Sequence, residues 1–483
     1  MAYKFTAESN NPILEKCYSF CNIWASETSG QNESFDNLTN AISKVKTAFV
    51  IATNKTLNPM TLKTLAVFSL LLFNFVQTFA CSMYKVTSNG KTVIGCNHDT
   101  WFLTPRIWFE NSGFGAGFTG ARFDGNNGVA PQSGMNEFGL AFSRLAAATP
   151  TKGTVGANKK PISNPTLFLK NVLHSFKTVE EVKNYIDQFD HSVFIQDVLI
   201  YVDQSGKYLI VEPYKTILGN DSKYVLANFC PSEITDFNSI KQERYINGTA
   251  FLKNNNGSDI HFFTALSDTM HVCRKKIGDG TLLTSIWDTN SGEVNLYFYH
   301  NYKHRVKFNL KEELAKGDHF FEVPTLFPKN KEFERLSEFK TPLNSKEIDR
   351  FLMFSSCLFL FSACYFPVSY LRKKSESRYK NLKLLLFPLS LVMLYFMFVL
   401  ATEMGFYYYP APYKDYKFSS LTIAAYVPFL ILLLIFPFAL INKNILKDKS
   451  WSFFGRWLFT INNLVYIILI ILFVYWGFYN IFS

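Results

Sequence analysis

Charged residues are scarce in this chain. They make up 18% of its 483 residues, against a usual share of about 25%. Hydrophobic residues make up 48% and aromatic residues 17%, so the composition excludes an intrinsically disordered chain. The mean hydropathy is nevertheless only +0.04, which excludes a protein embedded in a membrane throughout. The apolar residues must therefore be concentrated in particular segments, and the length predicts two or three domains.

The chain also lacks a glycine-rich phosphate-binding loop and an obvious metal-binding motif. His300 and His304 have a spacing that occurs in metal sites, but they fall at a predicted strand end with no acidic or cysteine partner nearby. We therefore predict no metal site and no cofactor.

Four apolar stretches begin after Asp349, where the composition changes. They cover residues 351–370, 384–401, 421–441 and 457–479, and none has a charge in its interior. Each is about long enough to cross ~30 Å of hydrocarbon at ~1.5 Å per residue. We predict an all-α transmembrane domain of about four helices over residues 346–483.

The net charge of +11 raises the possibility of nucleic-acid binding, but the charges are distributed as in a membrane protein. Linker residues 371–383 hold six basic residues and one acid, for +5, and linker residues 442–456 hold four and one, for +3. Residues 402–420 are balanced. By the positive-inside rule, the first and third linkers are cytoplasmic. We therefore expect a multi-pass protein of the cytoplasmic (inner) membrane, with the preceding domain on the extracytoplasmic side, contact with membrane lipid and no nucleic-acid partner.

A secretory signal pattern precedes that domain. Met60 and Lys63 are followed by an apolar core of 12 residues, 65–76, and then by small residues at positions 78 and 80. We predict a signal peptide over residues 60–80, cleaved after Ala80, and interpret residues 1–59 as an extension that is disordered or not translated. The alternative is an uncleaved anchor, although 12 apolar residues are short for a span.

Cleavage after Ala80 would make Cys81 the first residue of the mature chain. A terminal cysteine carries its own α-amino group, whose pKa near ~7.7–8 suits it to accept the thiol proton. A structural cysteine and a lipid-modified cysteine are the alternatives, although residues 78–80 lack the small aliphatic pattern that precedes a lipidated cysteine.

The following residues predict a β-hairpin. Residues 81–87 alternate, Asn89-Gly90 is a preferred pair for a two-residue type I′ turn, and residues 92–94 return. Such a turn makes paired positions sum to 179, which places Cys81 opposite His98 and next to Asp99. In a regular strand Asp99 would face the other way, so a bulge or bend must turn it toward Cys81.

Further motifs follow in order along residues 81–327. They are Cys81-Ser82, Asn97-His98-Asp99, Gly134-Met135-Asn136-Glu137, Ala227-Asn228, Arg244-Tyr245 and Ser285-Ile286-Trp287-Asp288. This series resembles the linear amide C–N hydrolases, which include choloylglycine (bile salt) hydrolases, penicillin V acylases and a related acyltransferase branch. The resemblance implies an α+β fold over residues 81–345, the four-layer αββα sandwich of N-terminal-nucleophile hydrolases.

The resemblance also implies roles for four residues. Cys81 would be nucleophile and base, attacking an amide carbonyl to form a thioester that water hydrolyses. Asp99 would hold the α-amino group. Asn228 would donate to the oxyanion, and Arg244 would orient the nucleophile and support Asp99.

The chain departs from the family pattern at two positions. Many members have an arginine where this chain has Cys96, and bile salt hydrolases have a second oxyanion asparagine where alignment gives Ala146. We therefore expect a different substrate class. Trp101, Trp108 and Phe109 are candidates to line an acyl pocket, although aromatic residues there are equally plausible as core.

The expected function is a membrane-anchored amidase that cleaves linear C–N bonds of small N-acyl compounds. Acyl transfer by the same fold and a non-catalytic sensor or binding module are the alternatives. In an oxidising compartment, a disulfide between Cys96 and Cys230 is a hypothesis, since both are close in sequence to predicted site residues.

Overall fold

The computed structural model describes residues 80–150, 153, 158–274, 276–372, 379–409, 411 and 420–480. The extension over residues 1–59 and the predicted signal peptide, apart from Ala80, lie outside the described residues. Residues 122–130, which contain the short helix η1 (Gly125–Asn127), are grouped in a separate compact unit. The remaining described residues contain two large sheets, their covering helices and a series of long helices.

One sheet has six antiparallel strands in the order β12-β1-β2-β13-β14-β15. Asn89 and Gly90 join β1 to β2 with φ values of 53° and 72°, as a type I′ turn requires. Cys81 pairs with His98, so the predicted hairpin and its register are confirmed. The strands are β1 (Ala80–Ser88), β2 (Lys91–Asp99), β12 (Lys223–Leu226), β13 (Thr281–Asp288), β14 (Glu293–Phe298) and β15 (Asn301–Asn309).

The second sheet has eight antiparallel strands in the order β11-β10-β9-β6-β5-β4-β3-β16. Its strands are β3 (Arg106–Glu110), β4 (Ala116–Gly120), β5 (Ser133–Asn136), β6 (Ala141–Ala146), β9 (Asp197–Val202), β10 (Tyr208–Glu212), β11 (Lys215–Gly219) and β16 (His319–Glu322). A small parallel pair, β7 (Lys160–Pro161) and β8 (Phe189–Asp190), completes the described strands.

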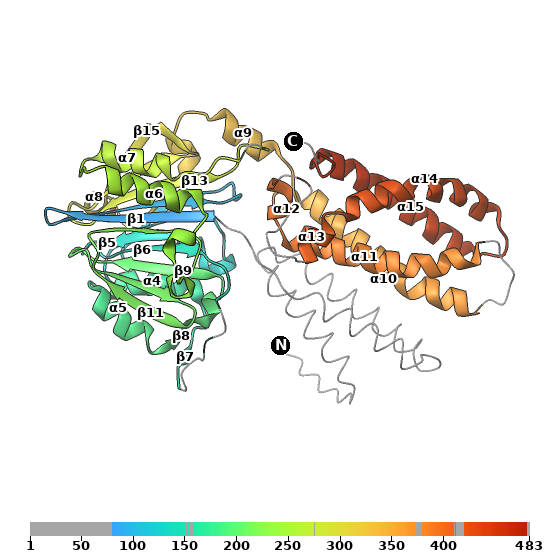
Figure 1. Ribbon diagram of the computed structural model, residues 1–483, viewed down its shortest axis with the longest axis horizontal. Coiled ribbons are helices and arrows are strands. Elements are labelled where there is room, and N and C mark those ends of the chain that lie inside the picture. Colours follow the sequence, from blue (N-terminus) through green and yellow to red (C-terminus); the bar gives the residue numbers. More distant parts are fainter. Residues whose placement is uncertain are drawn as a thin grey trace. The chain divides into compact units, whose positions relative to one another are not determined.

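Helices cover the outer face of each sheet. On the six-stranded sheet, α6 (Glu243–Asn254) contacts β1 and β12, and α7 (Ile260–Thr269) contacts β2. On the eight-stranded sheet, α4 (Pro165–Ser175) contacts β5, and α5 (Val179–Ile186) contacts β9 and β10. The two sheets meet through β1 with β6 and β13 with β5, and Figure 1 shows the resulting order of helix, sheet, sheet and helix. The predicted α+β, four-layer αββα fold is confirmed.

Shorter elements connect these layers. They are η2 (His191–Phe194), η3 (Pro231–Glu233), η4 (Phe237–Ser239), α8 (Leu310–Leu314), η5 (Val323–Leu326) and α9 (Lys331–Glu338).

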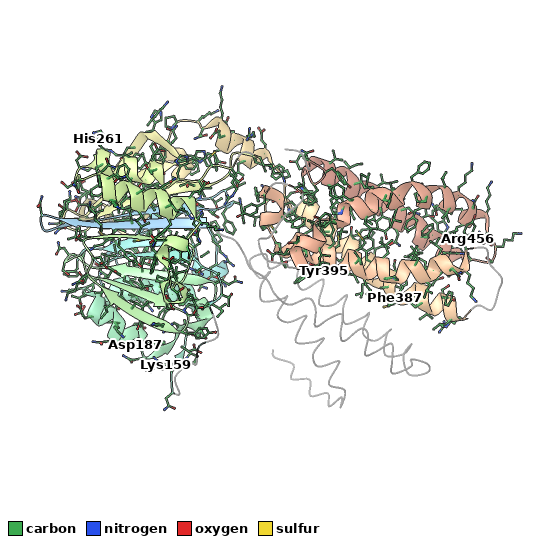
Figure 2. All side chains as sticks on the ribbon, in the orientation of Figure 1. Lys159, Asp187, His261, Phe387, Tyr395 and Arg456 are labelled. Atoms are coloured by element: carbon green, nitrogen blue, oxygen red, sulfur yellow. The ribbon has the colours of Figure 1, made fainter. Side chains whose placement is uncertain are left out.

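The strand β1 is buried on both of its faces. Its side chains alternate, so that Cys81 and Met83 belong to the core between the sheets, whereas Tyr84 and Val86 belong to the core under α6 and α7. In the neighbouring strand β2, only the first of nine residues is exposed. Figure 2 shows side chains filling the space between the sheets. Because both faces of β1 are covered, groups at its start are shielded from water.

Four helices near the end of the described chain are long and apolar enough to cross a membrane. They fall on the four predicted apolar stretches, which supports a membrane protein with a helical domain. Their outward side chains include large apolar residues such as Leu433 and Phe436, which are 74% and 71% exposed. The helices are α10 (Lys346–Arg372), α11 (Lys380–Thr402), α14 (Val427–Lys447), which follows the short α13 (Ser420–Ala424), and α15 (Phe453–Tyr475), with α12 (Gly405–Tyr408) after α11.

Gly95 on β2 provides a test of the packing above the hairpin. A Cβ added there would lie 2.1 Å from Cζ of Tyr84, whose hydroxyl is bonded to the Phe263 carbonyl at 2.8 Å and to Ser267 at 2.9 Å. We expect Gly95→Ala to lower the free energy of unfolding by about 1–3 kcal/mol, because the anchored ring cannot move aside freely. The measurement is the unfolding midpoint of the full chain in detergent.

The control compares the Tyr84→Ala variant, which lacks the ring, with the double variant Tyr84→Ala/Gly95→Ala. Gly95→Ala should add little destabilisation in that background. Equal effects in both backgrounds would contradict the clash.

Candidate active site

Asn228 gathers hydrogen-bond donors around Cys81. It lies just after β12, the strand that pairs with β1. Its Oδ1 accepts a hydrogen bond from the backbone N–H of Cys81 at 3.0 Å and another from the guanidinium of Arg244 on α6. Gln242 holds Asn228 in turn, because its side-chain amide accepts from the Asn228 N–H and donates to the Asn228 carbonyl, each at 3.1 Å. The fold thus brings Cys81, Asn228 and Arg244 together across the sequence.

The orientation of the Asn228 amide follows from its partners. Oδ1 faces two donors, so the other terminal atom must be the nitrogen. Nδ2 donates to the carbonyl of Ala146 at 2.6 Å, which leaves its second N–H for another acceptor. The predicted oxyanion role of Asn228 would depend on that second N–H. Ala146, where the family pattern has an asparagine, contributes a backbone carbonyl to the site.

Asp99 ends β2 directly opposite Ala80 and next to Thr281 of β13. The pairing of β1 with β2 is regular through Asp99, so the predicted bulge is absent from this hairpin, and the register shift beside Asp99 lies between Thr281 and Leu283 on β13. The Thr281 hydroxyl donates to Asp99 Oδ1 at 2.6 Å, whereas Oδ2 is buried and has no partner among the described residues. Burial raises the pKa of Asp99 to about 6, against the opposing charge of Arg244.

The thiol of Cys81 is held in an unreactive state in this arrangement. The side chain is only 4% exposed, and Sγ lies 3.9 Å from the Asp99 carbonyl oxygen. Burial, and then the charge of Asp99, raise the pKa of the thiol to about 12. Because β1 begins at Ala80, the nitrogen of Cys81 is an amide here and carries no charge. The charge of Arg244 opposes this rise without overcoming it, so the thiol would need a further base or cation to become reactive.

The three predicted pocket residues are spread over two sides of the eight-stranded sheet. Trp101 and Phe109 belong to the same core as Cys81, and the Trp101 indole donates to Asp279 at 2.8 Å. Trp108 faces the α4 side, where Lys170 lies 5.5 Å from its ring centroid and its indole donates to Glu110 at 2.9 Å. An acyl-binding role for these aromatic side chains stays a prediction.

Sequence reasoning missed Gln242 and Thr281, which support the predicted residues. Gln242 is two residues before Arg244 and acts through the backbone of Asn228. Thr281 bonds Asp99 from 182 positions away in the chain. The position of Gln242 beside Arg244 was a usable signal, whereas the contact of Thr281 had none, because it depends on how β13 pairs with β2.

The hypothesis of a disulfide between Cys96 and Cys230 is wrong for this structure, in which both are free thiols. Cys96 points between the sheets among Ser133, Ser143 and Ser285, and its burial raises its pKa to about 12. Cys230 directly precedes the short helix η3, and burial followed by the charge of Glu212 raises the pKa of its thiol. Proximity in sequence to the site residues therefore did not predict proximity of the two sulfurs.

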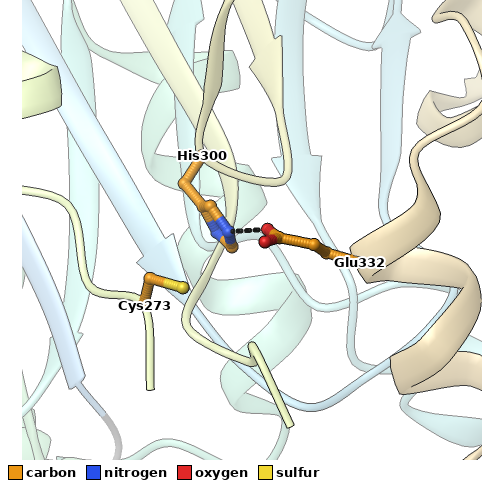
Figure 3. Close-up of side chains that lie close together, drawn as sticks. All are labelled: Cys273, His300 and Glu332. Atoms are coloured by element: carbon orange, nitrogen blue, oxygen red, sulfur yellow. Dashed lines mark hydrogen bonds and ion pairs between the residues drawn. The ribbon is translucent and has the colours of Figure 1, made fainter. Parts of the chain in front are cut away.

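The expectation that His300 has no acidic or cysteine partner is also wrong. Its Nε2 lies 2.9 Å from Glu332 Oε2, and Cys273 is close to both (Figure 3). His304, by contrast, is exposed on β15. Both partners of His300 come from segments about 30 positions away, so its local sequence gave no sign of them.

The raised pKa of Asp99 predicts a pH-dependent stability. A carboxyl group with a folded pKa of about 6 and an ordinary pKa of 3.8 favours the folded state fully below pH 3.8 and loses that contribution as the pH rises through 6. In chains that keep the Ala80–Cys81 bond, Asp99→Asn should therefore raise the free energy of unfolding at pH 8 by up to about 3 kcal/mol. The gain should vanish near pH 4, as measured by denaturant unfolding at both values.

The matched control is Glu338→Gln, at an exposed carboxylate on α9. It should change stability little at either pH. A difference for Asp99→Asn that is the same at both pH values, or a loss of stability at pH 8, would show that burial of the Asp99 charge is not what the substitution relieves.

No family model and no curated protein matches the chain. Among solved structures, the chain is similar to a mutant of the conjugated bile acid hydrolase from Clostridium perfringens, with 17% identity, a TM-score of 0.41, and coverage of 52% of this chain and 97% of that one. A second variant of the same hydrolase has 19% identity, a TM-score of 0.38 and the same coverage. Penicillin V acylase from Agrobacterium tumefaciens has 15% identity, a TM-score of 0.41, and coverage of 50% of this chain and 91% of that one.

Proposed function

We propose that this protein is a membrane-anchored amidase that uses Cys81 as an amino-terminal nucleophile. The observation that carries the proposal is the meeting of Cys81, Asp99, Asn228 and Arg244 from four separate segments. The amide nitrogen of Cys81 lies 3.0 Å from Asn228 Oδ1, and buried Asp99 Oδ2 has no partner among the described residues. After cleavage of the Ala80–Cys81 bond, that nitrogen would be an ammonium group with an acceptor already in place.

The chemistry follows from the free amine. The unprotonated α-amino group takes the thiol proton, and Sγ attacks the carbonyl carbon of a linear amide. The oxyanion forms within reach of the second N–H of Asn228 Nδ2. The α-ammonium then gives its proton to the leaving amine as the C–N bond breaks, which leaves a thioester on Cys81. Water, deprotonated by the same amine, attacks the thioester and releases the acid.

Two features support an apolar acyl group on the substrate. Cys81 lies in an apolar core, and four apolar helices follow in the same chain. A lipid-like amide, such as an N-acyl amine or an N-acyl amino acid, would partition into the membrane beside the enzyme. Hydrolysis needs no metal or cofactor in this scheme.

Mass analysis of the mature chain and activity assays test the nucleophile. We expect the chain to begin at Cys81 and to release acid and amine from a panel of N-acyl amides that differ in chain length. Cys81→Ala should abolish turnover, and Asn228→Ala should lower kcat by about 10²–10³, the usual cost of losing an oxyanion donor. Asn184→Ala, at an exposed position of α5, is the matched control and should leave kcat unchanged.

Three outcomes would redirect the proposal. A mature chain that still begins before Cys81 would remove the base and sink the mechanism. Trapping of the thiol with transfer of the acyl group to an added amine would show an acyltransferase. A reduced, accessible amino-terminal cysteine without turnover of any amide would favour a binding module.

We also propose that the sandwich lies outside the cytoplasm. The support is the charge of the linkers, +5 for residues 371–383 and +3 for residues 442–456, since basic linkers stay in the cytoplasm. Cleavage by a signal peptidase requires the same side for Cys81.

Fusions to alkaline phosphatase, which is active only outside the bacterial cytoplasm, test this orientation. A fusion after Tyr409 should be active, and fusions after Arg372 and Lys449 should be inactive. β-Galactosidase fusions at the same positions control for expression and should give the opposite pattern. Alkaline phosphatase activity at Arg372 with none at Tyr409 would reverse the orientation.

A further inference from the structure

Three potential metal ligands converge away from Cys81, from three separate segments. Cys273 lies in the connection between α7 and β13, His300 in the turn between β14 and β15, and Glu332 in the first turn of α9. Their ligand atoms all lie within 4.8 Å of one another, and Figure 3 shows the Cys273 sulfur directed toward the imidazole. Thiolate, imidazole and carboxylate are the three ligand types that zinc takes from proteins.

The hydrogen bonding of His300 orients it as a ligand. Its Nδ1 lies 3.3 Å from the backbone carbonyl of Thr281, an acceptor only, so Nδ1 carries the proton. Nε2 is therefore the atom available to a metal. In this structure it donates to a carboxylate oxygen of Glu332 at 2.9 Å, because a carboxylate only accepts, and it must release that proton when it binds a metal. Metal-binding histidines commonly donate their other N–H to a carbonyl in this way, which fixes the tautomer and the ring.

The backbone that carries His300 is unusual. Tyr299 and His300 have φ values of 52° and 43°, so both central residues of the turn are in the left-handed region. Asn-Gly pairs normally fill such positions, because larger side chains are strained there. We infer that a tyrosine and a histidine occupy these strained positions because of what their side chains do, since neither residue type favours the turn.

The Tyr299 hydroxyl is a second, independent sign of a missing group. Tyr299 is fully buried, and its hydroxyl has no hydrogen-bond partner among the described residues. Its ring lies beside the cluster, with its centroid 4.7 Å from that of the His300 ring. A water molecule bound to a metal there would supply the acceptor that the hydroxyl lacks.

We propose that Cys273, His300 and Glu332 bind a zinc ion, with a water molecule as the fourth ligand of a tetrahedral site. On binding, the Cys273 thiol and the Nε2–H of His300 each lose a proton to solvent, and the thiolate and the neutral imidazole coordinate the metal together with the Glu332 carboxylate. No oxidation or reduction takes place. The ion would tie α9 to the β14–β15 turn and to the segment before β13.

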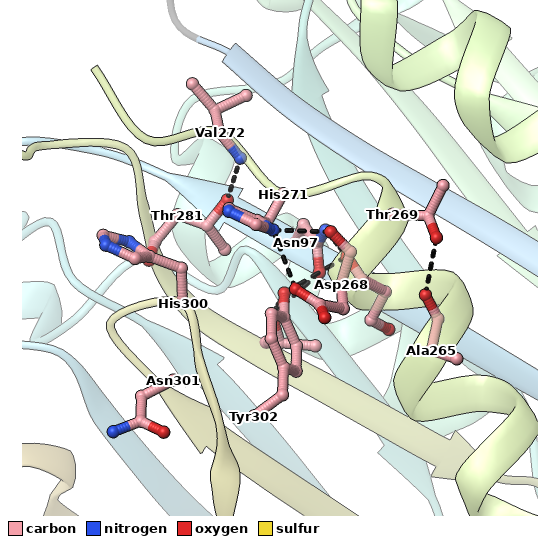
Figure 4. Close-up of polar contacts among 12 residues, drawn as sticks. Asn97, Ala265, Asp268, Thr269, His271, Val272, Thr281, His300, Asn301 and Tyr302 are labelled. Carbon is pink, nitrogen blue, oxygen red and sulfur yellow. Dashed lines mark hydrogen bonds and ion pairs between the residues drawn. The ribbon is translucent and has the colours of Figure 1, made fainter. Parts of the chain in front are cut away.

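The site would also steady Thr281, which lies between it and Asp99. The Thr281 carbonyl bonds His300, its hydroxyl accepts from the Val272 N–H at 2.9 Å, and it donates to Asp99 at 2.6 Å. Figure 4 shows His300 and Val272 on either side of Thr281. Thr281 is thus a positioning residue that the metal would hold from the far side, although metal binding itself does not depend on the proposed amidase activity.

Metal analysis of the full chain tests the proposal. The protein is purified in detergent with a tag free of histidine, incubated with zinc chloride, desalted and analysed by mass spectrometry for bound metal. The wild type should hold one zinc ion per chain. Cys273→Ser and His300→Ala should lose it. Glu332→Gln should raise the Kd for zinc by more than about tenfold, because even the loss of a residue that only supports a ligand costs about that much.

Two matched variants control for the change of residue type. His304→Ala lies on β15 close to His300, and Glu334→Gln lies on α9 close to Glu332, and both positions are exposed. Both variants should bind zinc as the wild type does. A wild type without zinc after this treatment, or equal loss of zinc in the control variants, would overturn the proposal.

Cobalt substitution and thermal unfolding separate ligation from misfolding. Cobalt in the wild type should give a thiolate-to-metal charge-transfer band that Glu332→Gln retains and Cys273→Ser lacks. Zinc should raise the unfolding midpoint of the wild type but not of Cys273→Ser, while the two metal-free proteins unfold alike. A cobalt spectrum without the thiolate band in the wild type would rule out the three-ligand site.

Discussion

The pairing of β1 with β2 is the constraint on which the candidate site depends. Asn89 and Gly90 close the hairpin in the left-handed conformation, and this fixes Cys81 opposite His98. A slip of one residue would move Cys81 from the core between the sheets to the face under α6 and α7. Asn228, just after β12, and Thr281, on β13, are placed by strands that pair with this hairpin, whereas Arg244 and Ala146 reach the site from α6 and from β6 of the other sheet.

One oxygen atom of Asn228 connects Cys81 with Arg244. Because Oδ1 accepts both from the Cys81 N–H and from Arg244, the guanidinium is held near Cys81 through Asn228. That cation opposes the rise in pKa of both Cys81 and Asp99, but burial outweighs it in each case. The site is therefore short of positive charge as it stands.

Local features of the sequence predicted much of this arrangement. The hairpin register followed from a two-residue turn, and the four apolar helices followed from hydropathy, because each depends on neighbouring residues only. Asn228 and Arg244 came from family resemblance, since nothing local marks them. Thr281, and the partners of His300, were missed because strand order and the position of α9 bring them in from distant segments. The disulfide between Cys96 and Cys230 was predicted wrongly because closeness in sequence to the site residues does not show which face of a strand a sulfur occupies.

The proposed cleavage after Ala80 would change the charge at the nitrogen of Cys81 as well as free a new amino terminus. In the intact chain, the nitrogen of Cys81 is a neutral amide, the thiol has a pKa of about 12, and the Asp99 carboxyl has a pKa of about 6. Cleavage would place an amine with a pKa near ~7.7–8 at the Cys81 nitrogen. In its charged form this group would lower the pKa of both neighbours, and in its neutral form it would accept the thiol proton. Under the proposed mechanism, breaking this one bond would therefore supply the base for the thiol and a second cation besides Arg244.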